Sequence, residues 1–406
     1  MAFIKKFVWF GVAILSAALC FGQTITVGSS TVQLNPSQRA SVSTYWPDGN
    51  MGAINHNGTN YIFGPTANPG TVQITLSNLN TWTSGLSSDA PATNISLGGS
   101  GAFDQNYAGG GAVYYDSASG YLIQLYHGEQ WFGGSGSPFY AAHGLAYSTD
   151  FGSHWTKLGE VVSPQSARVN NGANCQSEIG TGTLLVVGSY LYDYFTDNAT
   201  GCPGNLYLSV ARAPIASVIA AAKSGTPFTS GAGTLFMKYT GNGTWNGNGV
   251  TDLANPQNGG GASTQIGPTP LNGGVVLEPN VRYDSYLSKY LLCYSNDFTD
   301  IECSFSADGV TAWTAAQAII TGGSYSSNAI YYPTLFNTGG GDPQTLGQTF
   351  SVFYVEPLFN PPWTNTNLYS TTLNVGQQPL PPVLAQPTVV TDSQASPAHM
   401  SGKPIK

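Results

Sequence analysis

The chain has 406 residues, of which 41% are hydrophobic and only 8% are charged, and its formal net charge is −8. Long amphipathic helices and coiled coils need charged solvent faces, so this composition excludes them as the main architecture. With 12 Lys and Arg residues against 20 Asp and Glu, no basic stripe exists for a phosphate backbone, which excludes nucleic acid as a partner. The 51 Gly, the 25 Pro and many aromatic residues predict short strands between frequent turns, and the sparse charge favours a neutral, hydroxyl-rich ligand.

The N-terminal segment has the pattern of a secretory signal peptide. Lys5 and Lys6 precede an apolar run over residues 7–19 that is too short to span a bilayer, and cleavage is expected near Gln23. We therefore assign residues 1–22 to the signal. We expect a secreted protein, extracellular or periplasmic, with no membrane contact once the signal is removed.

A module of two strands recurs five times in the mature chain. Each copy begins with a polar or acidic residue, continues as an apolar strand, turns, and returns as a strand rich in aromatic residues. The copies begin near Asp48, Gly111, Glu178, Glu278 and Tyr331. Such hairpins cannot bury their apolar faces alone, and radial repetition of small sheets buries them. The repeat predicts an all-β, five-bladed β-propeller over residues 38–375; a β-sandwich, or two stacked β domains, is the alternative.

Two segments, Ser148 to Trp155 and Ser306 to Trp313, are near copies of each other. Both resemble the Asp box, S-x-D-x-G-x-x-W, a hairpin turn of sialidases and other propellers, although the second has its Gly one position early. In such a turn, Asp and Gly shape the backbone and Trp packs between adjacent sheets. The resemblance implies a structural role on the face away from the active site.

The sequence predicts one short surface helix, from Pro214 to Lys223. The segment is rich in Ala and Ile, with Pro near its first position and Gly225 after its end. The Gly- and Asn-rich segment from Thr240 to Gly261 is expected to be a loop. Residues 376–406 are Pro-rich without periodicity and are expected to form a tail.

Four cysteines remain after the signal, and export places them in an oxidising compartment. Four cysteines allow three pairings. Cys293 and Cys303 flank a turn-rich segment, so they can face each other across a hairpin, which leaves Cys175 to pair with Cys202. The alternative is a metal site, which the absence of CxxC and HxH spacing disfavours.

In a propeller, the start of each inner strand and the end of each second strand lie at one mouth of the central axis. The chain has only 20 carboxylates, yet several occur at these positions. The acidic, histidine and aromatic residues expected there are Asp48, Asp104, Tyr107, His127, Glu129, Glu178, Asp197, Glu278, Asp297, Tyr332 and Glu356. Paired carboxyl groups suit glycoside hydrolysis, in which one carboxylic acid protonates the leaving oxygen and a carboxylate activates water or attacks the sugar. The alternative is that these acids cap strands, shape turns or hold a structural Ca²⁺ ion, for which the sequence has no motif.

With these residues in place, the chain resembles the five-bladed β-propeller glycoside hydrolases of family 43 and their distant relatives. The resemblance implies that Asp48, in Tyr45-Trp-Pro-Asp48-Gly, is the general base and that Glu178, before Ile-Gly180, is the general acid. It implies that Asp104 tunes the pKa of the acid. We therefore expect a monomeric hydrolase that acts on a neutral poly- or oligosaccharide and requires no cofactor.

Six further residues are expected to bind substrate. Glu129 lies two residues from His127 on the same side of a strand, which suits sugar hydroxyls, acid/base chemistry or a metal. The other four are Trp131, Trp245, Glu278 and Tyr332.

Two other functions stay open. A non-catalytic glycan-binding propeller would keep the aromatic residues with one or two acids. A sialidase needs three arginines for the sugar carboxylate, and this chain lacks an F/Y-R-I-P motif and has four arginines in all: Arg39, Arg168, Arg212 and Arg282. No GxSxG, HExxH or Walker A motif indicates another chemistry.

Overall fold

The computed structural model describes residues 21–43, 45–67, 70–82, 92–93, 95–132, 139–165, 176–200, 206–227, 235–252, 259–324, 328–356 and 366–379. The chain divides into two compact units, one of residues 25–376 and one of residues 1–24 with 377–406. The larger unit holds nearly all of the described strands.

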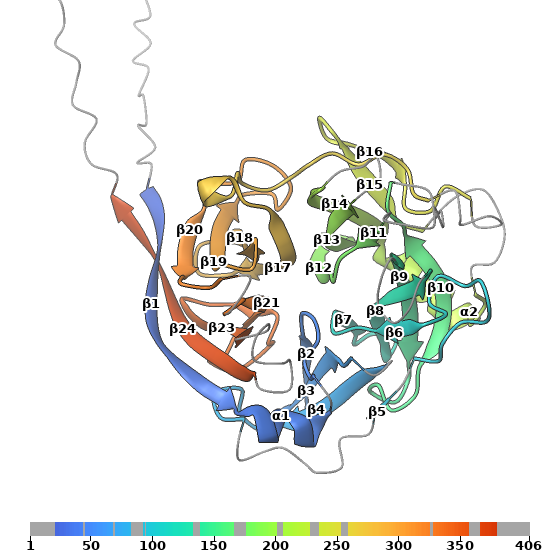
Figure 1. Ribbon diagram of the computed structural model, residues 1–406, viewed down its shortest axis with the longest axis horizontal. Helices are drawn as coiled ribbons and strands as arrows, with labels where there is room; N and C mark the ends of the chain where they lie inside the picture. The colour runs from blue at the N-terminus through green and yellow to red at the C-terminus, as the bar shows by residue number, and fades with distance from the viewer. Residues whose placement is uncertain are drawn as a thin grey trace, which may run out of the picture. The chain divides into compact units, whose positions relative to one another are not determined.

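Strand pairing in the larger unit gives five antiparallel blades in a ring (Figure 1), which confirms the expected all-β, five-bladed propeller. Blade one is β2 (Gly52–His56), β3 (Thr59–Pro65), β4 (Thr71–Leu76) and β5 (Ala92–Thr93). Blade two is β6 (Tyr107–Gly109), β7 (Val113–Asp116), β8 (Tyr121–Trp131), β9 (Phe139–Ser148) and β10 (Thr156–Val162). Blade three is β11 (Gln176–Ile179), β12 (Thr183–Val187), β13 (Tyr190–Thr200), β14 (Leu206–Pro214), β15 (Met237–Gly241) and β16 (Thr244–Asn248).

The last two blades complete the ring. Blade four is β17 (Val276–Asp284), β18 (Lys289–Asn296), β19 (Asp300–Ser306) and β20 (Gln317–Ile320). Blade five is β21 (Tyr331–Phe336), β23 (Thr349–Glu356), β24 (Asn367–Pro379) and β1 (Phe21–Leu34), and its β22 (Thr345–Leu346) pairs with β17 of blade four. The strand β1 begins before residue 38, where the sequence analysis placed the start of the propeller. Since β1 pairs with β24, the first and last described strands share one blade, which closes the ring.

Blades two and three form one continuous sheet, because β11 pairs in parallel with β9. Glu178 of β11 lies opposite Ala141 of β9 and opposite Asn198 of β13. The backbone at Glu178 is therefore fixed from both sides.

Apolar cores lie between neighbouring blades, as radial packing requires. Met51, Ile62, Phe336 and Phe353 belong to one buried cluster shared by blades one and five. Hydrogen bonds that involve side chains also join neighbouring blades. The donor and acceptor pairs are Thr71 Oγ1 to Gly110 O at 2.9 Å, Thr183 Oγ1 to Pro279 O at 2.8 Å, Leu335 N to Asn280 Oδ1 at 3.0 Å, and Met51 N to Thr334 Oγ1 at 3.0 Å.

Two α-helices are present where the sequence analysis expected one. The expected helix is α2 (Ile215–Ser224), which follows Pro214 and ends at Gly225 in the left-handed conformation with φ of 60°. The second, α1 (Pro36–Val42), was missed because its seven residues are too few to show a helical period. It begins with a capping box, in which Asn35 and Gln38 each bond the other's backbone N–H.

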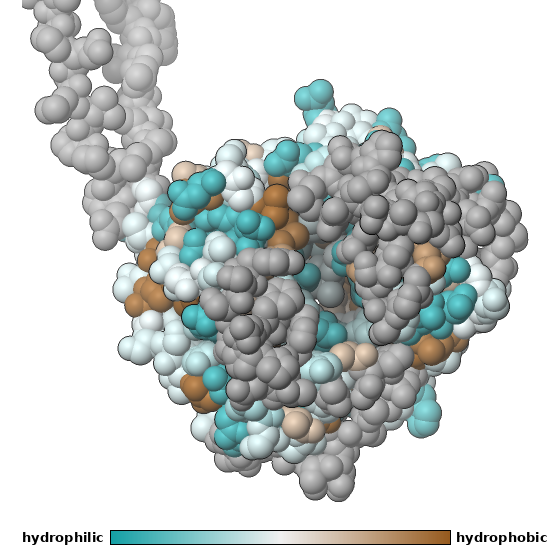
Figure 2. Space-filling view, viewed as in Figure 1, coloured by the Kyte–Doolittle hydropathy of each residue, from teal (hydrophilic) through white to brown (hydrophobic). Residues whose placement is uncertain are grey.

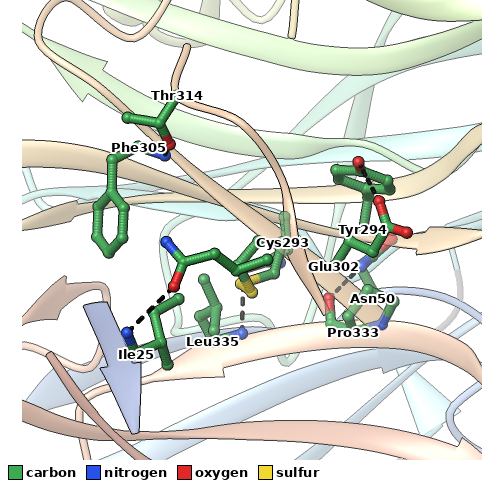
Figure 3. Close-up of a disulfide and its surroundings, with 12 residues drawn as sticks. Ile25, Asn50, Cys293, Tyr294, Glu302, Phe305, Thr314, Pro333 and Leu335 are labelled. Carbon is green, nitrogen blue, oxygen red and sulfur yellow. Dashed lines mark hydrogen bonds between the residues drawn. A yellow bond between two sulfur atoms is a disulfide. The ribbon is translucent and has the colours of Figure 1, made fainter. Parts of the chain in front are cut away.

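A disulfide joins Cys293 and Cys303, which lie directly opposite each other on β18 and β19 (Figure 3). This confirms one of the two expected pairs. Cys175 and Cys202 lie outside the described residues.

The two turns that resemble Asp boxes connect β9 to β10 in blade two and β19 to β20 in blade four. In the first, Asp150 Oδ1 accepts hydrogen bonds from Ser148 Oγ at 2.7 Å and from the His154 N–H at 2.9 Å. Asp308 accepts equivalent bonds from Ser306 Oγ and the Thr311 N–H, at 3.0 and 2.7 Å. The ring of Trp155 lies 6.0 Å from that of Phe63, so the first turn also joins blade two to blade one.

Candidate active site

The inner strands begin at one mouth of the axis, and this mouth carries most of the predicted site residues. Asp48 precedes β2, Glu178 lies in β11, Glu278 in β17 and Tyr332 in β21. In the view down the axis, hydrophilic residues surround the hollow at the centre of the ring (Figure 2).

Blades four and five reach this mouth through the same backbone feature. Glu278 and Tyr332 have positive φ angles of 53° and 57°, and each precedes a proline, Pro279 or Pro333. At both places the strand register shifts, which marks a β-bulge. A bulge redirects a side chain out of the ladder. Positive φ at a residue other than glycine costs about 1–3 kcal/mol, and such residues concentrate at functional sites.

Asp48 is the acid of blade one. Its Oδ1 accepts a hydrogen bond from Tyr332 Oη at 3.1 Å, so blades one and five meet at this carboxyl group. Burial raises the pKa of Asp48 to about 6, against the hydrogen bond from Tyr332, which lowers it. The negative charge of Glu129 also raises this pKa, and the positive charges of Arg39 and His127 lower it.

Glu178 and Glu278 are the acids of blades three and four. Burial, followed by the negative charge of Glu178, raises the pKa of Glu278 to about 8. The positive charge of His127 opposes this shift, and the negative charge of Asp48 adds to it. The acids of blades one, three and four therefore interact electrostatically within one site.

His127, Glu129 and Trp131 form the wall of the mouth on β8. Glu129 Oε1 lies 3.1 Å from His127 Nε2, and its Oε2 accepts a hydrogen bond from Trp131 Nε1 at 2.6 Å. Burial lowers the pKa of His127, but the hydrogen bond and the charge of Glu129 outweigh burial, and the pKa is raised to about 9. Glu178 and Glu278 contribute to that rise, which connects this wall to the carboxyl groups.

Asp104 and Trp245 have other interaction partners. Asp104 Oδ2 accepts hydrogen bonds from Tyr126 Oη at 2.9 Å and from Lys157 Nζ at 2.6 Å. Trp245 belongs to β16, in a segment expected to be a loop, and its ring lies 4.1 Å from the guanidinium carbon of Arg212. Within the described part of the chain, neither residue contacts the carboxyl groups at the mouth.

Four residues of the mouth have contacts that the sequence did not predict, although one of them, Tyr107, belongs to the segment from Asp104 to Tyr107 that was expected there. Tyr107 begins β6, at the blade-two position where the resemblance pointed to Asp104, and its ring lies 6.1 Å from that of His127. Its place directly before the strand was the available signal. Burial, with the charges of nearby carboxylates, holds the pKa of Tyr107 well above its usual value. The other three are Arg39, Asn50 and Thr181.

A cavity of about 900 Å³ opens at the opposite end of the axis, where the inner strands end. Its lining includes Ile54, Tyr115, Val186, Tyr283 and Asp342. The larger hollow is therefore separate from the carboxyl groups.

No group of three or more His, Cys, Asp or Glu side chains in the described ranges is placed to hold a metal ion. None of the described helices has the length and apolar character needed to cross a membrane.

No protein-family model and no curated protein matches this chain. Solved structures do resemble it. The catalytic domain of a GH62 α-L-arabinofuranosidase from Coprinopsis cinerea aligns with a TM-score of 0.48 at 12% identity, covering 86% of this chain and 96% of that one. An endo-1,4-β-xylanase from Bacteroides thetaiotaomicron gives 0.44 at 13%, covering 81% and 91%. An exo-1,5-α-L-arabinanase from a bovine ruminal metagenomic library gives 0.43 at 12%, covering 80% and 91%.

Proposed function

We propose that this protein is a secreted glycoside hydrolase that acts on a neutral poly- or oligosaccharide. Asp48 is the general base, and the general acid comes from the neighbouring glutamates, Glu178 and Glu278. The sequence resemblance favours Glu178 for that role. The raised pKa of Glu278 makes Glu278 the second candidate.

One observation carries the proposal: two half-buried carboxyl groups of the same site have pKa values on either side of neutrality. The pKa of Asp48 is raised to about 6 and that of Glu278 to about 8. At pH 7, Asp48 is therefore mostly ionised and Glu278 mostly protonated. Glycosidic cleavage needs this combination of one carboxylate and one carboxylic acid.

The surroundings of the carboxyl groups suit a sugar. Trp131, Tyr107 and Tyr332 supply aromatic rings, whose apolar faces can pack against sugar C–H groups. His127 and Glu129 supply a donor and an acceptor for hydroxyl groups. Among the described arginines, Arg39, Arg212 and Arg282, only Arg39 acts on the charge of Asp48, so the described residues hold no arginine triad for a sugar carboxylate, which disfavours a sialic acid substrate.

Several sequence-based expectations accompany this proposal. Secretion by the signal at residues 1–22, a monomeric state and a structural Ca²⁺ ion stay predictions. The turns at Asp150 and Asp308 are proposed to be Asp boxes with a structural role, since their carboxylates are occupied by hydrogen bonds within the turn.

The test is release of reducing sugar from arabinan, xylan and β-1,3-galactan by the wild type and by Asp48→Asn, Glu178→Gln and Glu278→Gln. We expect activity on at least one neutral polysaccharide, and loss of about 100-fold or more in Asp48→Asn. Tyr283→Phe, in the cavity at the opposite end of the axis, is the matched control and should keep wild-type activity. Binding of a polysaccharide without turnover would favour the glycan-binding alternative, and turnover unaffected by all three carboxyl substitutions would overturn the assignment.

A further inference from the structure

A chain of hydrogen bonds runs from the backbone of blades four and five to the carboxyl group of Glu278. Asn50 Nδ2 lies 3.2 Å from Glu278 O and 2.6 Å from Pro333 O. Asn50 Oδ1 lies 2.7 Å from Thr181 Oγ1, which in turn contacts Glu278 Oε2. The catalytic role of this chain rests on the proposed function, but the direction of its hydrogen bonds does not.

The orientation of the Asn50 amide is fixed by its partners. Carbonyl oxygens only accept hydrogen bonds, so the amide nitrogen must face Glu278 O and Pro333 O, and Asn50 Oδ1 must face Thr181. Asn50 is only 2% exposed, so no bulk water can serve Oδ1. Leaving this buried acceptor unpaired would cost about 1–3 kcal/mol. Thr181 therefore donates its hydroxyl hydrogen to Asn50.

The Thr181 hydroxyl has one hydrogen, and donation to Asn50 uses it. Two acceptors, a hydroxyl oxygen without a free hydrogen and a carboxylate oxygen, cannot form a hydrogen bond with each other. The contact between Thr181 Oγ1 and Glu278 Oε2 is satisfied only when Glu278 is the donor, which requires a protonated carboxyl group. Hydrogen-bond direction thus runs from Glu278 through Thr181 to Asn50.

We infer that Asn50 and Thr181 are positioning residues that keep a proton on Glu278, and that Glu278 is the general acid. In the reaction, the Glu278 proton passes to the glycosidic oxygen as the bond to the anomeric carbon breaks. Water forms the new bond to that carbon and gives its proton to Asp48. The Thr181 hydrogen can then turn from Asn50 to the new carboxylate of Glu278, and proton exchange with solvent restores both groups.

Thr181→Val tests the direction of the chain. If Thr181 accepts from Glu278, the substitution removes a bond to the neutral acid, and the pKa of Glu278 falls by about one unit. If Thr181 instead donates to a carboxylate, the substitution removes a bond to the charged form, and the pKa rises. The two arrangements therefore predict opposite shifts.

The measurement is the titration of the Glu278 carboxyl carbon by NMR in protein labelled with ¹³C-glutamate, assigned with Glu278→Gln. Thr181→Ser should restore the wild-type value, and Thr181→Ala replaces Thr181→Val if the latter does not fold. Thr183→Val is the matched control, because Thr183 Oγ1 bonds Pro279 O beside Glu278 but is outside the chain of bonds. An unchanged or higher pKa in Thr181→Val, with Thr183→Val unchanged, would overturn the inference.

The same variants separate this inference from the proposed function. With a hydrolysable polysaccharide, the alkaline limb of the kcat/KM profile should move with the NMR pKa in Thr181→Val and return in Thr181→Ser. A titration that behaves as expected in a protein without hydrolase activity would leave the hydrogen-bond chain standing and remove the function. Activity that persists in Glu278→Gln at wild-type level would remove Glu278 as the acid.

Discussion

The two ends of the propeller axis differ in chemistry more than in shape. The mouth holds Asp48 and Glu278, half-buried carboxyl groups whose pKa values are raised, and two strained bulges. The opposite end holds the cavity of about 900 Å³, where Asp342 is the sole charged residue of the lining. The carboxylate of Asp342 accepts hydrogen bonds from Thr345 Oγ1 at 2.8 Å and from the Gln344 N–H at 3.1 Å, so it is occupied by its own turn. The volume of a cavity is therefore a poor guide to the candidate active site of this fold. Carboxyl groups that interact and have raised pKa values are a better guide.

The backbone explains the difference. Inner strands are regular where they end, so their residues alternate between the two faces of each blade. At the mouth, bulges at Glu278 and Tyr332 interrupt this alternation and direct both side chains toward the axis. Glu278 and Tyr332 therefore lie where the regular pairing of the inner strands is interrupted.

The largest effect should come from removing the ionisable groups of the mouth. Glu278→Gln and Asp48→Asn should each lower kcat/KM by about 10²–10⁴-fold, because each removes one proton-transfer group. Tyr283→Phe, in the cavity at the opposite end, should stay within about twofold of the wild type. The measurement is initial-rate kinetics on the polysaccharide found by the screen. A larger loss in Tyr283→Phe than in the carboxyl variants would reverse the comparison between the two ends.

The pH dependence of activity should reflect the same two groups. Activity needs ionised Asp48 and protonated Glu278, so kcat/KM should fall below about pH 6 and above about pH 8. Glu178→Gln removes a negative charge that raises the pKa of Glu278, and its alkaline limb should move to lower pH by about one unit. A limb that stays in place in this variant would show that Glu178 does not act on the acid.

Stability should depend on pH through the same mouth. In the unfolded chain Glu278 loses its proton near its ordinary pKa of 4.5, whereas the folded protein keeps that proton up to about pH 8. The folded state therefore binds more protons in this window, and the free energy of unfolding falls as pH rises through it, by at most about 1.4 kcal/mol per pH unit for this proton. His127, with its pKa raised from 6.5 to about 9, acts in the same direction at higher pH.

Thermal unfolding between pH 5 and 9 measures this slope. Glu278→Gln should show a smaller fall in Tm than the wild type, and Tyr283→Phe should show the wild-type fall. Equal slopes in the wild type and Glu278→Gln would mean that Glu278 is ionised in the folded protein near neutral pH.

Much of the fold could be predicted because most of its strands pair with strands that are adjacent in the sequence. Each blade contributes a hairpin whose turn, such as Asn57-Gly58 or Gly188-Ser189, is followed by an aromatic strand. The strand β1 escaped this reasoning because its partner, β24, lies at the other end of the sequence. The helix α1 escaped because it is short and its signal is confined to the capping residues.

The site was predictable in part because its acids are scarce. Asp48, Glu178 and Glu278 could be found from their places before or within the inner strands. For the blade-two position, the family resemblance implied an acidic residue and so favoured Asp104, although Tyr107 lies nearer the strand. The raised pKa of Glu278 could not be found from the sequence, because it depends on burial and on the charge of Glu178, which comes from another blade.

The smallest expected effect concerns α1, which supports the mouth from outside the ring of acids. Asn35 Oδ1 accepts from the Gln38 N–H at 3.0 Å, and this cap begins the helix that carries Arg39. Arg39 Nε donates to Trp46 O at 2.7 Å, and its charge lowers the pKa of Asp48. Asn35→Ala should cost about 1 kcal/mol and lower Tm by about 2 °C.

Loss of this cap should also loosen Arg39 and move the acidic limb of activity to slightly higher pH, while the alkaline limb stays in place because Glu278 depends on other partners. Asn35→Ser keeps a capping oxygen and should restore both the Tm and the limb. A shift confined to the acidic limb would show that α1 affects Asp48 and leaves Glu278 unchanged. A shift of both limbs would instead mean that the mouth responds to α1 as one unit.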